Sequence, residues 1–467
     1  MALKESAENV SMHGFARIAI TQQKALKVVW LTLVLGALCM LGIQIKYIVS
    51  NFISYPSVTN SKTVIASSMP FPAVTFCSSL ASRNKLAMLN FSNLDKNLDE
   101  DLLNKSMPDI RVERQAKFFL LIRSKESLKN VSVDGSSLFL SNVSGSCSFG
   151  IYGTCNYPRD FKDTLTISRG FCHTFNHDGK SKQVRSGTDY GMSLIVFLNV
   201  SDSVPWTDKV VGDAIEILVH DHKQFPFPAS GSILAPVGAF TQIQLRKRMK
   251  TRKRRPFRSN CTNGENIRLL FPGAYSVRNC QESCYAWKMA EKCNSVEFYL
   301  NMFLPKHLQM PPPNTTKAAD CIYGVFDELE ESAFKSCGCE LPCHETDFLT
   351  PVFYSKWPAQ SDLRYYKLIF SQALGLDAAT VTDDYIRSNF ARINLFYSDM
   401  SYEEIHEEGS YAWDHMVSDM GGQMGVWIGA SVFSMAELIY LSVQLVHYFF
   451  TKKRISSTEL SLQPTGH

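Results

Sequence analysis

Two hydrophobic segments lie near the ends of the chain, with a long polar region between them. From Val28 to Ile45 eighteen residues carry no charge, and this length suits a short transmembrane helix. A signal peptide is the competing interpretation, but the run is too long, starts late and lacks a small-residue cleavage site. From Met420 to Phe450 the only charge is Glu437. This second segment exceeds the thickness of the hydrocarbon core as one helix, so it must tilt, break or project beyond it.

Basic residues flank both segments on their outer sides, at Lys24 and Lys27 and again at Lys452, Lys453 and Arg454. By the positive-inside rule both termini are cytoplasmic, and the region between the spans is extracellular. We therefore expect a two-pass protein of the plasma membrane. Its expected parts are a cytoplasmic segment 1–26, a first transmembrane helix 27–49, an ectodomain 50–415, a second transmembrane helix 416–450 and a cytoplasmic segment 451–467.

Sequons for N-glycosylation support this topology, because all but one lie between the spans. The exception, Asn9, is interpreted as chance. The expected glycosylation sites are Asn90, Asn104, Asn130, Asn142, Asn199, Asn260 and Asn314.

Twelve of the thirteen cysteines also lie between the spans, an even number suited to disulfides outside the cell. Cys39 lies in the first span, where we expect a buried free thiol. Inside a cell, the spacing of Cys337, Cys339, Cys343 and His344 would suggest zinc. Outside the cell disulfides are favoured, so no metal site is expected, and spacing alone leaves the pairing open.

The ectodomain is predicted to be α+β and stapled by disulfides. Alternating apolar runs bounded by turn residues predict strands at Met192–Val200, Ala214–His220 and Phe240–Leu245. Leu86–Arg123 and Ser361–Phe390 have compositions or spacings typical of helices.

The amino-acid composition adds little to the predicted division into two membrane spans and an ectodomain. Of 467 residues 45% are hydrophobic and 20% charged, which excludes a disordered or collagenous chain. The net charge of +4 is too small to indicate nucleic acid. Residues 246–258 nevertheless carry nine basic side chains. They suit a solvated strand or loop edge, a patch for an acidic partner or lipid headgroup, or a processing site at Arg252–Arg255.

The second hydrophobic segment has the composition of a pore. It concentrates small residues at Gly421, Gly422, Gly425, Gly429 and Ala430, which also suit a close helix–helix contact. Ser431 and Glu437 add polarity inside the membrane, where a carboxylate normally faces a bundle interior or watery cavity. A helix broken at Gly-Ala-Ser can line a hole with backbone carbonyls. One such span cannot enclose a pore, so these features indicate a cation pathway in a cyclic oligomer.

Several motifs in fixed order carry a family resemblance. They are His13-Gly14; Phe71-Pro-Ala-Val-Thr-Phe-Cys77; Gly170-Phe-Cys-His-Thr-Phe-Asn176; Val219-His-Asp221; Tyr275-Ser276 before Cys280 and Cys284; Cys337-x-Cys339-x2-Pro-Cys343; Trp357-Pro358; and Gly421-Gly-Gln-Met-Gly-x3-Gly-Ala-Ser431 with Glu437. From end to end the chain resembles the epithelial sodium channel, degenerin and acid-sensing ion channel superfamily.

The resemblance implies a trimer whose ectodomain has finger, thumb, palm, knuckle and β-ball parts. It implies a selectivity filter at Gly429, Ala430 and Ser431, where the second span breaks, and a gating motif at His13 and Gly14. It places the pore and gate at Ser418, Asp419, Gly422, Gly425 and Glu437. It also implies disulfides Cys77–Cys172, Cys147–Cys155, Cys261–Cys343, Cys280–Cys339, Cys284–Cys337 and Cys293–Cys321.

The sequence says less about the stimulus that opens the channel. The stretch after Cys77 and the residue Tyr440 depart from the acid-sensing pattern, and the compact chain looks most like the short cnidarian channels gated by RFamide peptides. We therefore expect an amiloride-sensitive cation channel that is opened by an extracellular peptide, with sodium as the first expected ion and calcium as a further candidate. Proton gating and constitutive or mechanical opening are the alternatives. The subunits are expected to form a homotrimer or a heterotrimer. The gating motion is expected to pass from the ectodomain through Trp357-Pro358 and near Tyr47 to the spans. No cofactor is implied.

Two rival classes explain less of the sequence. A trimer gated by extracellular ATP shares the two-pass plan but lacks the Gly-Ala-Ser belt. A two-pass adhesion protein or receptor would explain the ectodomain and leave Glu437 without a purpose. An enzyme is disfavoured because the sequence has no nucleophile elbow, phosphate loop or exposed metal triad.

Overall fold

The computed structural model describes residues 15–78, 80–82, 128–130, 132–167, 169–205, 212–310, 316–332 and 335–434, with residues 436, 439, 440 and 443. The chain divides into two compact units. Unit 1 contains Met1–Val58, Arg255–Arg258 and Glu407–His467. Unit 2 contains Thr59–Arg254 and Ser259–His406.

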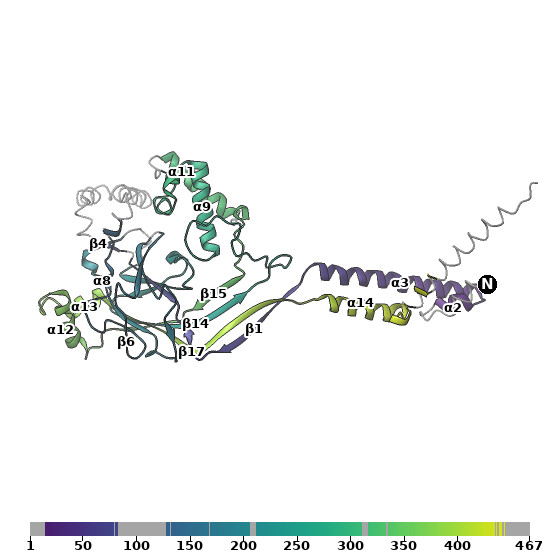
Figure 1. Cartoon of the computed structure of the whole chain (residues 1–467), viewed down its shortest axis with the longest axis horizontal. Coiled ribbons are helices and arrows are strands. Elements are labelled where there is room, and N and C mark those ends of the chain that lie inside the picture. Colours follow the sequence, from purple (N-terminus) through teal and green to yellow (C-terminus); the bar gives the residue numbers. More distant parts are fainter. Residues whose placement is uncertain are drawn as a thin grey trace, which may run out of the picture. The chain divides into compact units, whose positions relative to one another are not determined.

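Unit 1 is built on helices (Figure 1). A short helix α2, Phe15–Ile20, precedes α3, Lys24–Ile53. Among the described residues α3 is the one helix that is long and apolar enough to cross a membrane. The helix α14, Trp413–Ile428, has 16 residues, so the described part of the second hydrophobic segment is too short to test the predicted second span.

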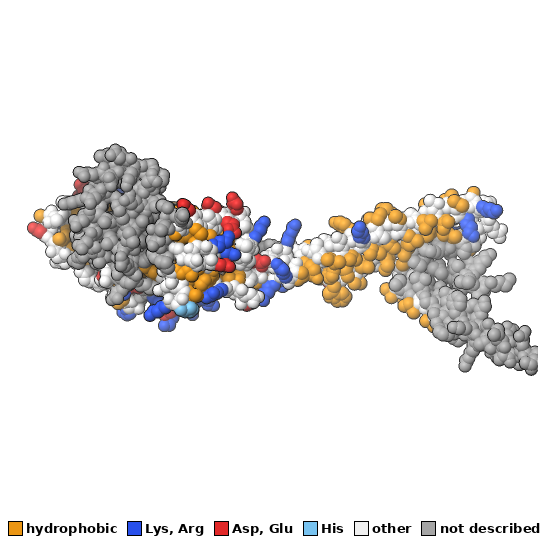
Figure 2. Space-filling view, turned by 90° about the horizontal axis from the view of Figure 1, so that it is seen from above, with side chains coloured by type: hydrophobic (Ala, Val, Ile, Leu, Met, Phe, Trp, Pro, Cys, Tyr) orange, Lys and Arg blue, Asp and Glu red, His pale blue; other side chains and the backbone are white. Residues whose placement is uncertain are grey.

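The helices α3 and α14 lie side by side and share a small apolar contact (Figure 1). Leu41 of α3 is buried with Ile428 and Ala430. Most other apolar side chains on α3 are exposed, and Figure 2 shows hydrophobic side chains along the surface of the helices. Cys39 is free and exposed, so the expectation of a buried thiol is wrong for the single chain, because no described part of it covers that surface.

The larger sheet of unit 2 has eight strands. Its main order is β15 His344–Leu349, β14 Ala239–Thr251, β17 Phe390–Gly409, β10 Met192–Phe197, β5 Cys147–Phe149 and β6 Gly153–Thr154. In addition, β1 Ser57–Ile65 pairs with β17, and β16 Val352–Lys356 pairs with β14. The strand β14 runs parallel to β17 and antiparallel to β15 and β16.

The first part of the basic segment, 246–251, forms the end of β14 and lies between paired strands, so its interpretation as a charged edge is wrong there. Residues 252–258 follow the strand in a mostly exposed loop, which agrees with the interpretation as a solvated loop. Several charges of the basic segment have partners on β15, since Arg248 and Lys250 both lie 2.9 Å from a carboxylate oxygen of Asp347. Arg252 lies 2.7 Å from Glu345. Cross-strand pairs of opposite charge stabilise a sheet, which explains why the strand continues through residues that look unsuited to its interior.

The second sheet has five strands: β13 Ile233–Pro236, β12 Ala214–His220, β3 Ala73–Ser78, β8 Gly170–Phe175 and β7 Phe161–Thr166. The predicted strand Ala214–His220 is confirmed at both ends. Both sheets contribute to one hydrophobic core, in which Phe76 and Ile217 of the smaller sheet join Met192 and Ile393 of the larger one.

Helices cover two further regions of unit 2. The first region contains α9, Val277–Cys293, and α11, Thr316–Glu331, with an apolar core that includes Phe271 and Met289. The second contains α12, Leu363–Leu374, and α13, Asp383–Asn389, as the helical spacing of 361–390 predicted. The predicted helices at Leu86–Arg123 lie outside the described residues. Shorter elements are α8 Gly135–Leu138, α10 Phe298–Asn301, β2 Met69–Pro70, β4 Leu80–Ser82, β9 Lys182–Gln183 and β11 Ser203–Pro205.

Six disulfides hold unit 2 together, and they join the pairs that the family resemblance implied. They are Cys77–Cys172, Cys147–Cys155, Cys261–Cys343, Cys280–Cys339, Cys284–Cys337 and Cys293–Cys321. Three of them fix α9, two to the segment that follows α11 and one to α11 itself. Each bridge removes conformations from the unfolded chain and so stabilises the folded unit.

Candidate pore segment and gating contacts

The helix α14 presents its small residues on one side. Ser418, Gly421, Gly422 and Gly425 are spaced by three or four positions, so they share a helix face. All four are exposed in the single chain, whereas Met424 and Ile428 belong to the contact with α3. The small-residue face is therefore open to lipid or to other chains.

A tyrosine before the helix contacts the predicted pore mouth. Tyr411 donates a hydrogen bond of 2.5 Å to Oδ2 of Asp419, two turns into α14. This bond is the main reason why the pKa of Tyr411 is raised to about 12. Tyr411 is therefore a neutral donor that holds the Asp419 carboxylate.

The helix α14 ends where the sequence predicted a break. Gly429 has φ +64° and ψ +23°, the left-handed conformation that glycine adopts at little cost. Its N–H donates to the carbonyl oxygen of Gly425 at 3.1 Å, and the N–H of Ala430 donates to Met424 at 3.2 Å. These bonds close the last turn in the manner of a left-handed C-terminal cap.

Two serines then start a new helical turn. The N–H of Ser434 donates to Oγ of Ser431 at 3.3 Å, and the N–H of Ser431 donates to Oγ of Ser434 at 3.2 Å. This reciprocal pair is a capping box in which serine replaces the usual glutamate. Residues 432–434 are helical, so the interruption spans Gly429, Ala430 and Ser431.

A break of this kind leaves carbonyl groups of the last turn without partners further along a helix. In a membrane such groups are tolerated only where they are buried in protein or line a watery cavity, and there they can coordinate cations. The break at Gly429–Ser431 thus has the local backbone geometry that the predicted selectivity filter requires.

An aromatic contact in unit 1 was not predicted from the sequence. Tyr55 directly follows α3, and its ring lies 5.8 Å from that of Phe257 in an edge-to-face arrangement. A Cβ atom placed on Gly409 would lie 3.1 Å from the ring of Phe257, so the ring also packs against the end of β17. Tyr47, which was expected near this junction, is 71% exposed. Trp357 packs instead against Tyr366 of α12, at 4.8 Å.

Phe257 lies in a short segment that belongs to a different unit from its neighbours in sequence. Residues Arg255–Arg258 group with unit 1, while Arg254 before them and Ser259 after them belong to unit 2. Phe257 is therefore joined to unit 2 by the backbone on both sides, within three positions. A sequence signal would have been hard to find, since the two rings are some two hundred positions apart.

The predicted processing site and the described glycosylation sites lie outside the pore segment. Arg252 donates to the carbonyl oxygen of Pro342 at 2.8 Å as well as pairing with Glu345, while Lys253, Arg254 and Arg255 lie exposed in the loop after β14. Among the sequons, Asn130 and Asn142 are exposed, and Asn199 and Asn260 are half-buried. His13, Gly14, Asn90, Asn104, Asn314 and Glu437 lie outside the described residues.

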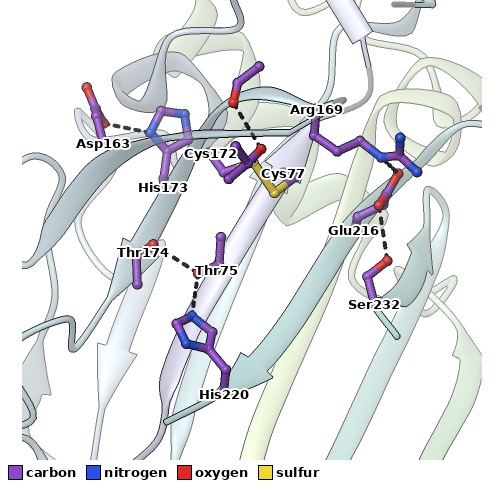
Figure 3. Close-up of a disulfide and its surroundings, with 12 residues drawn as sticks. Thr75, Cys77, Asp163, Arg169, Cys172, His173, Thr174, Glu216, His220 and Ser232 are labelled. Carbon is purple, nitrogen blue, oxygen red and sulfur yellow. Dashed lines mark hydrogen bonds and ion pairs between the residues drawn. A yellow bond between two sulfur atoms is a disulfide. The ribbon is translucent and has the colours of Figure 1, made fainter. Parts of the chain in front are cut away.

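Unit 2 holds buried polar chains beside the Cys77–Cys172 bridge (Figure 3). Nε2 of His220 lies 2.8 Å from Thr75 Oγ1, which lies 2.9 Å from Thr174 Oγ1. The second ring nitrogen of His220 lies 2.9 Å from the carbonyl oxygen of Asp221 and must donate to it. Burial of the imidazole lowers the pKa of His220 to about 4. His220 is therefore a neutral, structural histidine.

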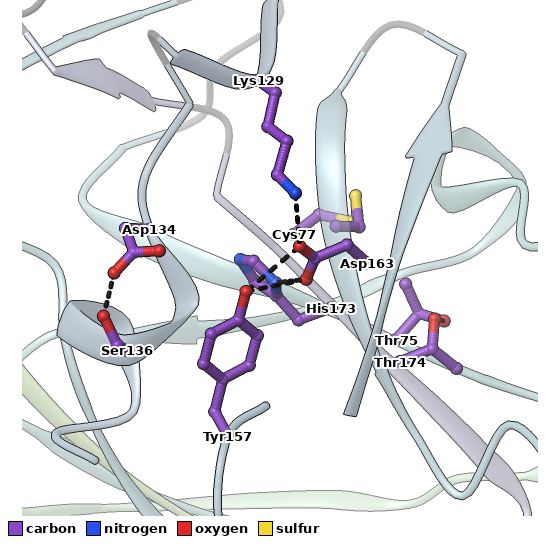
Figure 4. A network of polar contacts seen from close by, with 10 residues as sticks. Thr75, Cys77, Lys129, Asp134, Ser136, Tyr157, Asp163, His173 and Thr174 are labelled. Carbon is purple, nitrogen blue, oxygen red and sulfur yellow. Dashed lines mark hydrogen bonds and ion pairs between the residues drawn. A yellow bond between two sulfur atoms is a disulfide. The ribbon is translucent and has the colours of Figure 1, made fainter. Parts of the chain in front are cut away.

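A second buried group surrounds Asp163 (Figure 4). His173 Nδ1 lies 2.8 Å from Oδ1 of this carboxylate, and the hydroxyl of Tyr157 donates to both oxygens at 3.0 and 3.1 Å. Lys129 lies 3.6 Å away. The hydrogen bond from His173 is the largest cause of the lowered pKa of Asp163, so the carboxylate stays charged and its charge is compensated locally.

Comparison with known proteins decides the family. The family model described as amiloride-sensitive sodium channel matches residues 6–441. The chain belongs to this family. It is consequently an ion-channel family subunit and not an enzyme, as the absence of catalytic motifs predicted.

Named relatives of this channel subunit come from mammals and nematodes. The human bile acid-sensitive ion channel is 25% identical over 480 residues, covering 99% of this chain and 90% of the human one. Degenerin del-1 of Caenorhabditis elegans is 29% identical over 304 residues, covering 64% of this chain and 44% of the degenerin. These relatives support the superfamily and give no support to the expected likeness to cnidarian peptide-gated channels.

A solved proton-activated chloride channel aligns over 90% of this chain and 97% of its own, with 7% identity and a TM-score of 0.33. A likeness at this level carries no argument about fold or function.

Proposed function

We propose that three subunits of this family assemble at the plasma membrane into an amiloride-sensitive cation channel. The observation that carries the proposal is the interruption of the second hydrophobic segment at Gly429–Ser431, with a left-handed cap before it and a serine capping box after it. Backbone carbonyls exposed by such a break line a cation pathway only where several chains surround it. The same three residues then form the selectivity filter.

The remaining assignments follow from this arrangement. Segments 27–49 and 416–450 cross the membrane, 50–415 is extracellular, and 1–26 and 451–467 are cytoplasmic. Ser418 and Asp419 lie at the outer gate, Gly422 and Gly425 line the wall below them, and Glu437 attracts cations on the far side of the filter. His13 and Gly14 affect gating from the cytoplasm, and the three subunits are identical or related.

The stimulus is an extracellular ligand, which opens the channel only if it binds the open state more tightly than the closed state. A neuropeptide is the first candidate. Protons are the second, favoured by a cluster across β1 and β17 in which His406 of β17 lies 3.3 Å, and Lys62 of β1 2.8 Å, from the carboxylate of Glu404. The name of the human relative adds bile acids to the compounds that should be screened.

The first experiment does not require the ligand. Ser418→Phe places a bulky ring on the small-residue face of α14 and should prevent closure if Ser418 lies beside the gate. Expressed in oocytes, with surface delivery verified, it should give a standing cation current that amiloride blocks. Val417→Phe is the matched control, since Val417 is the neighbouring exposed residue on another side of the helix.

The outcomes separate the alternatives. Current in Ser418→Phe but not in Val417→Phe supports the channel and the position of the gate, and peptide, proton and bile acid applications to the wild-type protein then identify the stimulus. Surface protein without current, alone and with co-expressed related subunits, would contradict the pore assignment and favour an adhesion protein or receptor.

A further inference from the structure

A cavity of about 430 Å³ lies in unit 2, where the five-stranded sheet meets the entry to the helical region of α9 and α11. Its walls come from β7, from the end of β8, from the loop after β12 and from residues 272–273 and Phe303. This size is within the range of pockets that hold small organic ligands.

One wall is apolar and rigid. Phe225, Pro226, Pro272 and Phe303 line it, together with Leu165 of β7. The rings of Phe225 and Phe303 lie 5.6 Å apart edge to face, and both contact Phe271 behind them, at 5.0 and 4.7 Å. Packed rings of this kind offer a fixed apolar surface and lose little entropy when a ligand binds.

The backbone joins the two sides of the cavity. The N–H of Ala274 donates to the carbonyl oxygen of Lys223 at 2.7 Å. Gly273 has φ +106°, and a Cβ atom there would lie 2.5 Å from the same carbonyl oxygen. Only glycine permits this approach, so the cavity is formed by the fold and not by loosely packed side chains.

The other wall is cationic. Lys162 and Lys223 line the cavity with His177 and His222, and all four are exposed. In the described part of the chain neither lysine makes an ion pair. The ring of His222 is held against Gly179, where a Cβ atom would lie 3.0 Å from it. These groups supply several N–H donors on one side of an apolar space.

The acidic groups nearby are already compensated. Asp163 also lines the cavity, but it receives hydrogen bonds from His173 and Tyr157 and has Lys129 at 3.6 Å. Asp221 accepts the backbone N–H of Lys223 at 2.9 Å and interacts electrostatically with the ammonium group of Lys247. The lysines therefore give the cavity a net positive character, which attracts anions and repels cations.

We propose that this cavity binds a small organic anion, with a carboxylate or sulfonate held by Lys162 and Lys223 and a compact apolar body packed against Phe225 and Phe303. The bound anion would contact both the sheet and the helical region. Binding itself does not rest on the proposed channel function.

The test uses 2-naphthoate as probe and the full-length protein in lipid nanodiscs, with binding measured by titration calorimetry and empty nanodiscs subtracted. The cationic analogue 2-naphthylmethylammonium has the same rings and the opposite charge. We expect naphthoate to bind and the ammonium analogue to bind at least about fivefold more weakly, the factor that roughly 1 kcal/mol of electrostatic preference gives.

Variants locate the site. Lys162→Glu and Lys223→Glu should each weaken naphthoate binding at least about fivefold, and Gln224→Trp, which fills the cavity from a lining position, should abolish it. Lys356→Glu is the matched control, because it makes the same charge change at an exposed lysine on β16, outside the cavity. Naphthoate binding that the three cavity variants leave unchanged, equal binding of the ammonium analogue, or no naphthoate binding would overturn the proposal. A silent channel would not affect this assay.

Discussion

Unit 2 buries its apolar side chains within one chain, whereas unit 1 leaves most of its apolar side chains exposed. Phe76, Ile217 and Ile393 are fully buried in the core that the two sheets share. In contrast, Val28 of α3 is 61% exposed and Val426 of α14 is 77% exposed. Apolar surface of this extent is stable only against lipid or other helices. The described part of unit 2 therefore has an apolar core of its own, whereas that of unit 1 is mostly open to its surroundings.

Covalent bonds follow the same division. All six disulfides lie in unit 2, and the free cysteine of the described chain, Cys39, lies in unit 1. Disulfides thus stabilise unit 2 covalently. Unit 1 has no disulfide among its described residues, and its helices are stabilised by their caps and by contacts with lipid or other helices. The four predictions below test this contrast, from the largest expected effect to the smallest.

Removing a bridge should affect only unit 2. The double variant Cys77→Ala with Cys172→Ala opens a link between residues 95 positions apart, and it should destabilise unit 2 by about 2–5 kcal/mol. Thermal unfolding of the purified protein and surface delivery would both report this loss. Cys39→Ala, the matched cysteine change in unit 1, should leave both unaltered. Equal losses in the two proteins would contradict the contrast.

Acid should weaken unit 2 through His220. Its pKa in the folded protein is about 4, against an ordinary value of 6.5, so the unfolded chain binds more protons between these values. This contribution to stability is fully present above pH 6.5 and declines as the pH falls towards 4, by on the order of 3 kcal/mol in total.

His220→Gln tests the effect, because an amide can replace both hydrogen bonds of the ring without titrating. Thermal unfolding of the full-length protein is followed from about pH 7.5 to about pH 4.5. The variant should be the less acid-sensitive of the two proteins, so the difference between them should change steadily with acidification. Parallel curves would show that His220 does not carry this dependence.

The serine capping box should stabilise the helix restart in unit 1. Ser431→Ala and Ser434→Ala should each cost about 1 kcal/mol, and the double variant little more than one of them, because each serine caps the other. Amide hydrogen exchange across residues 425–434 in nanodiscs would measure the loss. Thr32→Ala is the control in α3, where the hydroxyl bonds to the carbonyl oxygen of Val28 at 2.9 Å and caps nothing. Additive losses at the two serines would argue against a shared box.

The glycines inside α3 should matter least. A Cβ atom on Gly36 or Gly42 would meet nothing within 4 Å in the part of the chain that the structure describes. Gly36→Ala and Gly42→Ala should therefore leave stability within about 1 kcal/mol or raise it slightly, as alanine favours helix. Thermal unfolding in nanodiscs measures this change. A large loss would mean that another subunit packs directly on these glycines.

Sequence patterns predicted some elements well and others only in part. The alternation in Ala214–His220 predicted β12 to the residue, because each side of that strand faces a different environment. The strand β14 was predicted only over Phe240–Leu245, because its basic half is stabilised by Glu345 and Asp347, nearly a hundred positions away. A local pattern contains no sign of such partners.

The candidate pore segment shows the same limit. Gly429, Ala430 and Ser431 marked the place of the break by composition, but the capping partner Ser434 was not predicted. The contact between Tyr55 and Phe257 was missed because it joins the end of a helix to a short segment far along the chain. The disulfide pairs came from family resemblance, since spacing alone allowed many pairings.

The central claim is that the break at Gly429 lines the cation pathway. The most direct measurement is the reversal potential of the standing current under sodium and potassium gradients, in Ser418→Phe alone and with Gly429→Ala or Gly36→Ala added. Alanine at φ +64° costs about 1–2 kcal/mol, so Gly429→Ala should distort the filter and reduce the sodium preference about fivefold or more. Gly36→Ala makes the same change in α3 and should keep the sodium preference, because a Cβ atom there would meet nothing within 4 Å in the described part of the chain. An unchanged sodium preference in Gly429→Ala would contradict the claim.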